Sequence, residues 1–566
     1  MTRSTALLLC LGLSFAAPVQ AQEDRPAGLF TTARQLPLVS QSIVIRVHGG
    51  EASIELSQVF ANDGPELAQA DFRLHLPREA CVTGFGFWHE GRFLAAEMKE
   101  REQARRDHDA AAASGRSTAI LHRERSIHSF SDFPVPAGAL QQVDATISLP
   151  VTTERGRSHV RLPLDHFLGH AHVTTSVVAH LSTSEDLHDL GVDGLSVLKR
   201  RRSPTAAELA FTTDEPVTIW WATENPPLLA RAEAVALDHG STAIQLRLAL
   251  NDASLSHHRA REIQVIIDES YSMLRRRQAV DTLLQRIREQ SKAPVRTVLV
   301  GESAHEITGG SPADVLSAMT SSDADFRTTW GNLQAAADRA GCHDPEVRCL
   351  VVTDPQVDGL PSNRDLNVLF LADADELSHF AEVIGPEAAT YQPDVDPAAT
   401  LRALADEIVL PVLEVKSIRQ GGDELTPVGS VRPRIAAGAM LRLCVESTSS
   451  RPLEVELEID GDSRLHPVSI DHLDPDSRAG RSVRRAFFRN RLDDLVNEYR
   501  RLRDPEVKRE IISISTRESI PTDFTSLHVA APDRVLSRSA TAAPLLRVVG
   551  LVLLLVAAAT RWYPRW

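Results

Sequence analysis

Apolar and polar residues alternate along much of the first half of the chain. The alternation is regular at residues 43–47, 54–56 and 72–76, continues to residue 248, and returns at 453–459. A period of two places every second side chain on the same face of a strand. We therefore predict half-buried strands in β-rich regions on both sides of a different central region.

The central region begins near Arg261, where continuous apolar runs replace the alternation. Such runs occupy residues 263–267, 296–300 and 347–352, and a helix is predicted between the first two at residues 273–289, with apolar side chains every three or four positions. Fully apolar strands that alternate with amphipathic helices are typical of a parallel sheet covered by helices on both faces.

Two polar segments outside the central region also have helical character. Residues 97–108 carry charges on almost every helical face, and residues 484–503 form a longer polar stretch. The first is interpreted as a solvated helix that leaves a sheet, because it has no apolar stripe with which to pack.

The amino-terminal segment predicts export. Residues 1–21 combine Arg3, an apolar run too short to span a bilayer and a small residue, Ala21, at the expected cleavage point. These three features define a secretory signal peptide.

The carboxyl-terminal segment predicts a membrane anchor. Residues 542–560 are apolar except for Arg547, which would extend its charge toward the headgroups, and Arg561 and Arg565 suit the cytoplasmic side. Two alternatives are a hydrophobic helix packed on the protein body and a sorting tail that is removed.

The charge and the cysteine content of the chain exclude several classes of function. The formal net charge of −15 argues against a nucleic-acid partner, since phosphate binding needs a concentrated positive field. Outside the signal peptide, the four cysteines are too few for a disulfide scaffold and contain no Cys-x-x-Cys pair for zinc. Cys342 and Cys349 could pair in an oxidising compartment, which the sequence alone does not decide. His166, His170 and His172 are interpreted as ordinary strand or loop histidines.

Several motifs in a fixed order resemble one known domain family. Residues 82–88 read Val-Thr-Gly-Phe-Gly-Phe-Trp, residues 99–106 read Lys-Glu-Arg-Glu-Gln-Ala-Arg-Arg, and residues 133–138 read Phe-Pro-Val-Pro-Ala-Gly. Together they resemble the vault protein inter-alpha-trypsin (VIT) domain, as in inter-alpha-trypsin inhibitor heavy chains and their bacterial relatives. The resemblance implies that a von Willebrand factor type A domain follows, where the parallel sheet is predicted.

The chemistry of the central region is centred on an Asp-x-Ser-x-Ser pattern. Asp268, Ser270 and Ser272 stand between a buried strand and a long helix, at the edge where open α/β sheets bind ligands. Asp252 begins a second copy of the pattern, but no helix follows it. The pattern at Asp268 resembles the metal-ion-dependent adhesion site (MIDAS) of von Willebrand factor type A domains.

The resemblance implies a site for Mg²⁺ or another divalent cation. The two serine hydroxyls would be direct ligands, Asp268 would supply charge, and Asp354 at the end of another strand would be the second carboxylate, since Mg²⁺ prefers oxygen ligands. Gly331 occupies the position of the family's threonine ligand. Thr329, or Thr328, is the candidate substitute.

The predicted function is binding rather than catalysis. The family's site leaves one coordination position for a carboxylate from a protein ligand, and no base of a known catalytic motif accompanies this pattern. We predict an exported, single-pass membrane protein that binds or adheres to another protein, with its main body in the periplasm or extracellular space. Alternatives are a metal-free scaffold or sorting-system component at the cell envelope, and a metal-dependent hydrolase.

The predicted fold class is multidomain α+β. It comprises a β-rich VIT sandwich, a doubly wound α/β domain of the von Willebrand A type, a carboxyl-terminal region of strands and helices, and one transmembrane helix. The predicted segments are a signal peptide at 1–21, a VIT domain at 36–155, a β-rich continuation at 156–258, a von Willebrand A-like domain at 259–410, a β-rich segment at 411–475, a helical segment at 476–530 and a transmembrane helix at 542–560.

Overall fold

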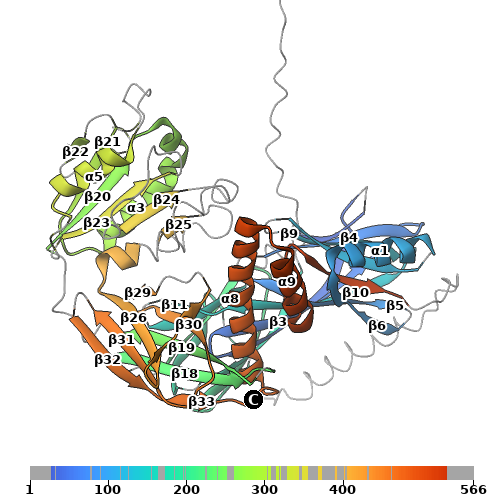
Figure 1. The fold of residues 1–566 in the computed structure, drawn as a ribbon. Helices are drawn as coiled ribbons and strands as arrows, with labels where there is room; N and C mark the ends of the chain where they lie inside the picture. The colour runs from blue at the N-terminus through green and yellow to red at the C-terminus, as the bar shows by residue number, and fades with distance from the viewer. Residues whose placement is uncertain are drawn as a thin grey trace, which may run out of the picture.

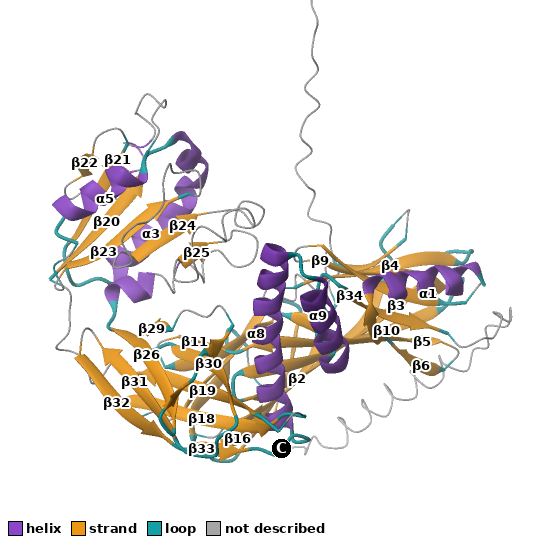
Figure 2. Ribbon diagram, viewed as in Figure 1, coloured by secondary structure: helices purple, strands orange, loops and turns teal. Residues whose placement is uncertain are grey.

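A computed structural model describes residues 27–531 with internal gaps, the longest of which are 163–172, 252–260, 308–313, 320–327, 355–366, 372–388 and 392–400. The chain is multidomain and β-rich, with one α/β unit in its middle (Figures 1 and 2). The predicted signal peptide and the predicted transmembrane helix lie outside the described residues. Among the helices that the structure describes, none combines the length and apolar character needed to cross a bilayer.

The first part of the chain builds two large sheets that share one core. Their strands alternate between buried residues and more exposed ones, as predicted. In β3 (Glu51–Ala61), for example, every second residue is buried. Aromatic side chains fill the space between the sheets, where the rings of Phe85 and Phe130 stack and those of Phe60 and Phe72 meet edge to face. In order across the sheets, the strands are β1 (Gly28–Phe30), β4 (Ala68–His75), β9 (Ile127–Val135), β8 (Thr118–Glu124), β34 (Thr525–Ala530) and β7 (Glu97–Glu100) in one, and β15 (Lys199–Arg202), β16 (Ala206–Thr213), β13 (Thr175–Ser182), β2 (Leu38–His48), β3 (Glu51–Ala61), β10 (Leu140–Pro150), β5 (Cys81–His89) and β6 (Arg92–Ala95) in the other.

Strand β34 comes from the far end of the chain. It pairs antiparallel with β7 on one side and with β8 on the other. The segment predicted as helical, 476–530, therefore contains two helices and then a strand that belongs to the first sheet.

The charged segment 97–108 is only partly helical. Residues 97–100 form β7, which pairs with β34, and helix α1 (Arg101–Ala113) begins after it. The prediction of a helix from residue 97 was wrong for its first turn. The side chain of Glu100 accepts a hydrogen bond from the backbone N–H of Gln103, so it caps the helix and fixes its start.

The β-rich continuation contributes strands to three sheets. β13 lies parallel to β2 and so extends the eight-stranded sheet. The last two strands of this region, at residues 228–236 and 242–250, pair with strands beyond residue 420. The remaining sheets are β11 (Thr152–Glu154), β12 (Arg157–Leu162), β17 (Val217–Thr223) and β14 (Leu187–Val192); β28 (Pro427–Val428), β30 (Met440–Ser447), β19 (Thr242–Leu250), β18 (Leu228–Ala236) and β33 (Ile470–His472); and β27 (Asp423–Glu424), β26 (Val412–Gln420), β31 (Leu453–Ile459) and β32 (Asp462–Val468), with β29 (Arg434–Ala436) beside β26.

Two helices join the first two sheets to a second pair of sheets, β28-β30-β19-β18-β33 and β27-β26-β31-β32, which share one core and are called the sandwich below. Helix α8 (Arg478–Leu502) packs on β18 and β19 of the sandwich, and helix α9 (Pro505–Glu518) lies beside α8 and reaches β7 (Figure 1). Phe487 and Phe488 of α8 are buried in this contact. The helices therefore place β34, which follows them, next to the first sheet.

The α/β unit has the predicted layered arrangement. Its central strands β21, β20, β23 and β24 run parallel, and their buried apolar residues form one core on each face of the sheet. The strand order is β22 (Ala304–Ile307), β21 (Val295–Val300), β20 (Glu262–Asp268), β23 (Val347–Thr353), β24 (Asn367–Leu371) and β25 (Ala389–Tyr391), and the helical elements are the 3-10 helix η2 (Tyr271–Arg276), α3 (Arg277–Gln290) and α5 (Trp330–Arg339).

A disulfide joins Cys342 and Cys349, the pairing that the sequence left undecided. Cys342 follows α5 and Cys349 lies in β23, with their Cα atoms 5.5 Å apart. The bond therefore ties a helix on one face of the sheet to a central strand.

Replacing Cys342 with serine is expected to lower the free energy of unfolding of the α/β unit. Loss of a cross-link that closes so short a loop costs about 2.5 kcal/mol in chain entropy. Hydrogen exchange of β23 amides at increasing urea concentration measures the change. Reduction of the wild-type protein should give the same decrease, and equal stability of Cys342→Ser and oxidised wild type would contradict the expectation.

Candidate cation site at the edge of the parallel sheet

Two neighbouring parallel strands end at the same edge of the α/β sheet. β20 pairs with β23 so that Ile267 lies beside Val352, and the next residues are Asp268 and Thr353. Asp354 follows directly. The two acidic residues predicted from the sequence are thus carried to one edge, the side of an open parallel sheet at which ligands bind.

Asp268 is fully buried and is held by two hydrogen bonds. Its Oδ1 accepts the backbone N–H of Ser270 at 2.8 Å, and its Oδ2 accepts the hydroxyl of Thr353 at 2.7 Å. Within the described part of the chain, no lysine or arginine forms an ion pair with Asp268. The two hydrogen bonds to this carboxyl group come from a backbone amide and a hydroxyl, both of which are neutral donors.

The two serines of the pattern face each other. Ser270 Oγ and Ser272 Oγ lie 3.0 Å apart, and both residues are partly buried. Ser270 stands at the start of η2, but its side chain does not cap that helix. Both hydroxyls are therefore close enough together to bind one ion.

Asp354 is also fully buried. Its backbone carbonyl accepts a hydrogen bond from Thr353 Oγ1 at 3.3 Å, while the same hydroxyl donates to Asp268. Thr353 thus links the ends of the two strands. Thr353 was not predicted as a site residue, although its place between a buried strand and an aspartate in the sequence could have indicated it.

The threonines considered as substitutes for the family's third hydroxyl have other partners. Thr329 Oγ1 accepts the backbone N–H of Asn332 at 3.2 Å and caps α5, and Thr328 Oγ1 donates to the carbonyl of Val300 at 2.9 Å. Neither of these two hydrogen bonds involves Asp268, Ser270 or Ser272. At Gly331 an added Cβ would meet only Thr329 Oγ1, at 3.7 Å, so a side chain could be accommodated there.

These residues fit a hard divalent cation. Two buried carboxyl groups and two adjacent hydroxyls at one edge of the sheet offer oxygen ligands, the kind that Mg²⁺ prefers. Within the described residues no group of three or more histidine, cysteine, aspartate and glutamate side chains could hold a metal. The second Asp-x-Ser-x-Ser copy at Asp252 and the three histidines at 166, 170 and 172 lie outside those residues.

Comparisons with known proteins support one assignment directly. Residues 38–148 match the family model of the vault protein inter-alpha-trypsin domain, inside the range predicted for it. No curated protein matches the sequence.

Solved structures with detectable similarity include von Willebrand factor type A proteins. One is the ArnB paralog VWA2 from Sulfolobus acidocaldarius, with 11% identity over 52% of this chain and 91% of that chain and a TM-score of 0.32. Another is von Willebrand factor type A from Catenulispora acidiphila, with 12% identity over 52% of this chain and 87% of that chain and a TM-score of 0.32. The pilus adhesin SpaC from Lactobacillus rhamnosus GG shows 11% identity over 44% and 48% at 0.21. TM-scores this low carry no argument about function.

The family match agrees with the ordered motifs at residues 82–88, 99–106 and 133–138 and with the β-rich structure around them. The resemblance to the VIT domain is thus confirmed. Residues 38–148 of this chain are therefore similar to the vault protein inter-alpha-trypsin domain family.

Proposed function

We propose that the protein is a non-catalytic binding module of the cell envelope whose α/β unit uses a divalent cation to hold a carboxylate of a protein partner. The observation that carries the proposal is the hydrogen-bonded group at the sheet edge. Asp268, Ser270, Ser272 and Thr353 come together there from two adjacent strand ends. Asp354 stands at the same edge.

Each residue has a distinct part in this mechanism. Thr353 and the backbone N–H of Ser270 orient the Asp268 carboxylate, and the side chains of Ser270 and Ser272 present their oxygens together. When bound, the cation would supply an electrophilic coordination position for the partner's carboxylate. This chemistry is binding, because nothing in the group is arranged as a base that would activate water.

The proposed location rests on features at both ends and in the middle. The predicted signal peptide at residues 1–21 and the apolar segment at 542–560 support export and a single membrane anchor. The disulfide between Cys342 and Cys349 supports an oxidising compartment, such as the periplasm or the extracellular space.

A metal-free scaffold at the cell envelope is the second candidate. It is favoured by one observation, which is that the group is already internally hydrogen-bonded. Asp268 accepts two hydrogen bonds and the serine hydroxyls bond to each other, while Thr328 and Thr329 are engaged elsewhere. In that case the α/β unit would be a rigid support.

Calorimetric titration with Mg²⁺ or Mn²⁺ separates the two candidates. The wild-type protein should bind one ion, and Asp268→Ala should weaken binding by about 100-fold or more, since removing even an indirect partner of a metal ligand costs 10- to 100-fold. Asp252→Ala, which disrupts the second copy of the pattern, is the matched control and should bind as wild type does.

Circular dichroism should confirm that the Asp268→Ala protein remains folded. Absence of heat with the wild-type protein would refute the cation site and leave the scaffold. Equal affinities of wild type and Asp268→Ala would place any ion elsewhere in the chain.

A further inference from the structure

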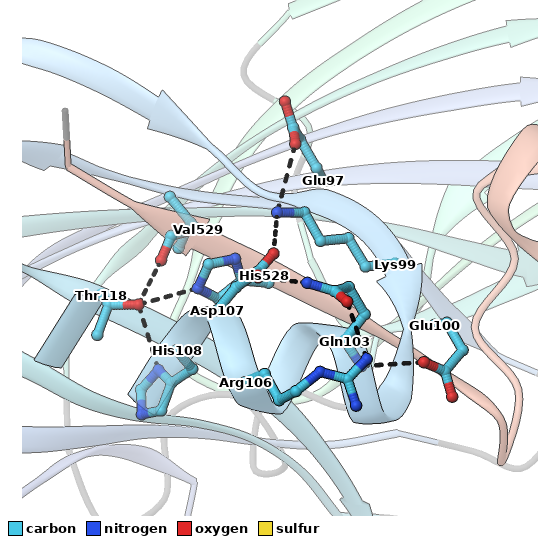
Figure 3. A network of polar contacts seen from close by, with 10 residues as sticks. All are labelled: Glu97, Lys99, Glu100, Gln103, Arg106, Asp107, His108, Thr118, His528 and Val529. Atoms are coloured by element: carbon cyan, nitrogen blue, oxygen red, sulfur yellow. Dashed lines mark hydrogen bonds and ion pairs between the residues drawn. The ribbon is translucent and has the colours of Figure 1, made fainter. Parts of the chain in front are cut away.

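Strand β34 is held in the six-stranded sheet β1-β4-β9-β8-β34-β7, called the VIT sheet below, by backbone pairing with β7 and β8 and by a buried polar contact. His528 Nε2 lies 3.1 Å from Thr118 Oγ1 of β8, and His108 Nδ1 of α1 lies 3.2 Å from the same oxygen (Figure 3). The hydroxyl also bonds to the carbonyl of Val529 at 2.9 Å. All three polar side chains are buried.

These three contacts determine which atoms carry the protons. The carbonyl of Val529 can only accept, so the single hydroxyl proton of Thr118 points toward it. The two ring nitrogens must then donate to the two lone pairs of Thr118 Oγ1. His528 therefore carries its proton on Nε2, and any second proton would have to enter at Nδ1 and make the ring a buried cation.

The surroundings of His528 oppose that second proton. Burial is the main cause, and the nearby cation of Lys99 adds to it, so that the pKa of His528 is lowered to about 4. Lys99 Nζ donates a hydrogen bond to Asp107 Oδ2 of α1 at 2.7 Å (Figure 3). The charge of Asp107 raises the pKa of His528 and so offsets part of the decrease.

Other elements around β34 carry further charges. Glu97 of β7 lies opposite His528 in the antiparallel register of the two strands. Arg116, between α1 and β8, lowers the pKa of His528, as Lys99 does. Strands β5 and β6, which also touch β34, place His89 and Arg92 at their shared hairpin end. Helix α9 meets the other end of the strand, through the hydroxyls of Ser515 and Thr525.

We propose that β34 is an acid-sensitive latch, which keeps the carboxyl-terminal part of the chain in the VIT sheet at neutral pH and releases it when His528 takes up a second proton. The shared hydroxyl of Thr118 couples the strand to both β8 and α1. The latch is independent of the proposed cation site.

The sign of the pH dependence follows from the two states of His528. In the released strand the pKa of its imidazole returns to its ordinary value of 6.5, whereas in the docked strand it is about 4. Docking is therefore fully stabilised above pH 6.5 and is progressively lost as the pH falls toward 4. These values predict a roughly 30-fold larger released population at pH 5.0 than at pH 7.5.

Amide hydrogen exchange of the intact protein at pH 7.5 and pH 5.0 tests the latch. After correction for intrinsic exchange rates, the protection of residues 527–529 should fall roughly 30-fold, while that of residues 265–267 in β20 of the α/β unit should stay constant. In His528→Gln the amide can still donate to Thr118 but cannot titrate, so the fall should shrink below about 3-fold. His472→Gln, an exposed histidine in β33, should behave as wild type.

Two results would overturn the proposal. One is unchanged protection of β34 in the wild-type protein between pH 7.5 and 5.0, and the other is an equal loss in wild type and His528→Gln. Should His528→Gln fail to fold, the wild-type profile decides, since a loss that begins only below pH 4 contradicts the latch.

Discussion

Truncation of the chain after Asp523 is expected to unfold the VIT domain at residues 38–148, although the deletion lies almost 400 residues away. The deletion removes β34, and with it the buried side chains of Leu527 and Val529. Each buried side chain contributes about 1.5 to 3 kcal/mol and each ladder hydrogen bond about 1 kcal/mol. The sum approaches the whole stability of an average domain, about 5 to 15 kcal/mol.

A matched truncation after Asp533 retains β34 and should leave the domain folded. Both proteins lack the predicted transmembrane segment, so a difference between them reports the strand alone. The rate of tryptic cleavage within residues 38–148, together with hydrogen exchange of β8 amides, measures the effect. Equal resistance of the two truncated proteins would show that β7 and β8 do not need a strand between them.

This dependence was not predictable from the local pattern. Residues 525–530 follow two helices, and nothing in so short a segment specifies the strands with which it pairs. The pairing of β34 with β7 joins residues more than 400 positions apart, and such register is fixed by complementary faces in the folded sheet. The family match, which ends at residue 148, likewise omits the strand that completes the sheet.

The layered α/β unit was predictable because its signals are local. Continuous apolar strands and the apolar stripe of α3 agree with the structure, and the end of β20 places Asp268 at the edge of the sheet. Parallel neighbours bring Asp354 to that edge as well. The hydrogen bond from Thr353 to Asp268 was missed, because it depends on which strand lies beside β20.

The position of Thr329 shows that capping a helix can compete with binding a metal ion for the same hydroxyl group. Thr329 precedes the first residue of α5, and its hydroxyl accepts the N–H of Asn332. Threonine is a favoured residue at such a position, because the first amides of a helix lack partners. Resemblance to a metal site suggested another role, but the local helix start gives the hydroxyl this partner.

A row of three arginines crosses the sandwich next to the VIT domain. Arg231 of β18 lies opposite Arg247 of β19, which in turn lies opposite Arg442 of β30. Like charges directly opposite on neighbouring strands are destabilising. Burial is the main reason that the pKa of Arg442 is lowered to about 10, and the charge of Arg247 acts in the same direction.

Two buried carboxylates compensate the row. Glu233 binds Arg247 at 2.9 Å, and Glu185 lies 3.3 Å from Arg231 and 3.6 Å from Arg247. The turn between β2 and β3 packs here as well, since a Cβ added to Gly49 would lie 3.8 Å from Glu233. The ion pairs therefore stabilise the junction between the VIT domain and the sandwich.

Glu233→Gln is accordingly expected to lower the free energy of unfolding by about 3 to 5 kcal/mol, the typical cost of breaking a buried ion pair by removing one of its partners. The three arginines would then share the single carboxylate of Glu185, so one buried positive charge would be left uncompensated. The substitution keeps the size and shape of the side chain, so the loss reports charge rather than packing. Glu55→Gln is the control, because Glu55 pairs with Arg46 at the surface, where an ion pair contributes at most about 1 kcal/mol. Urea unfolding of both variants gives the comparison, and an equal, small effect in the two would show that the arginine row does not depend on Glu233.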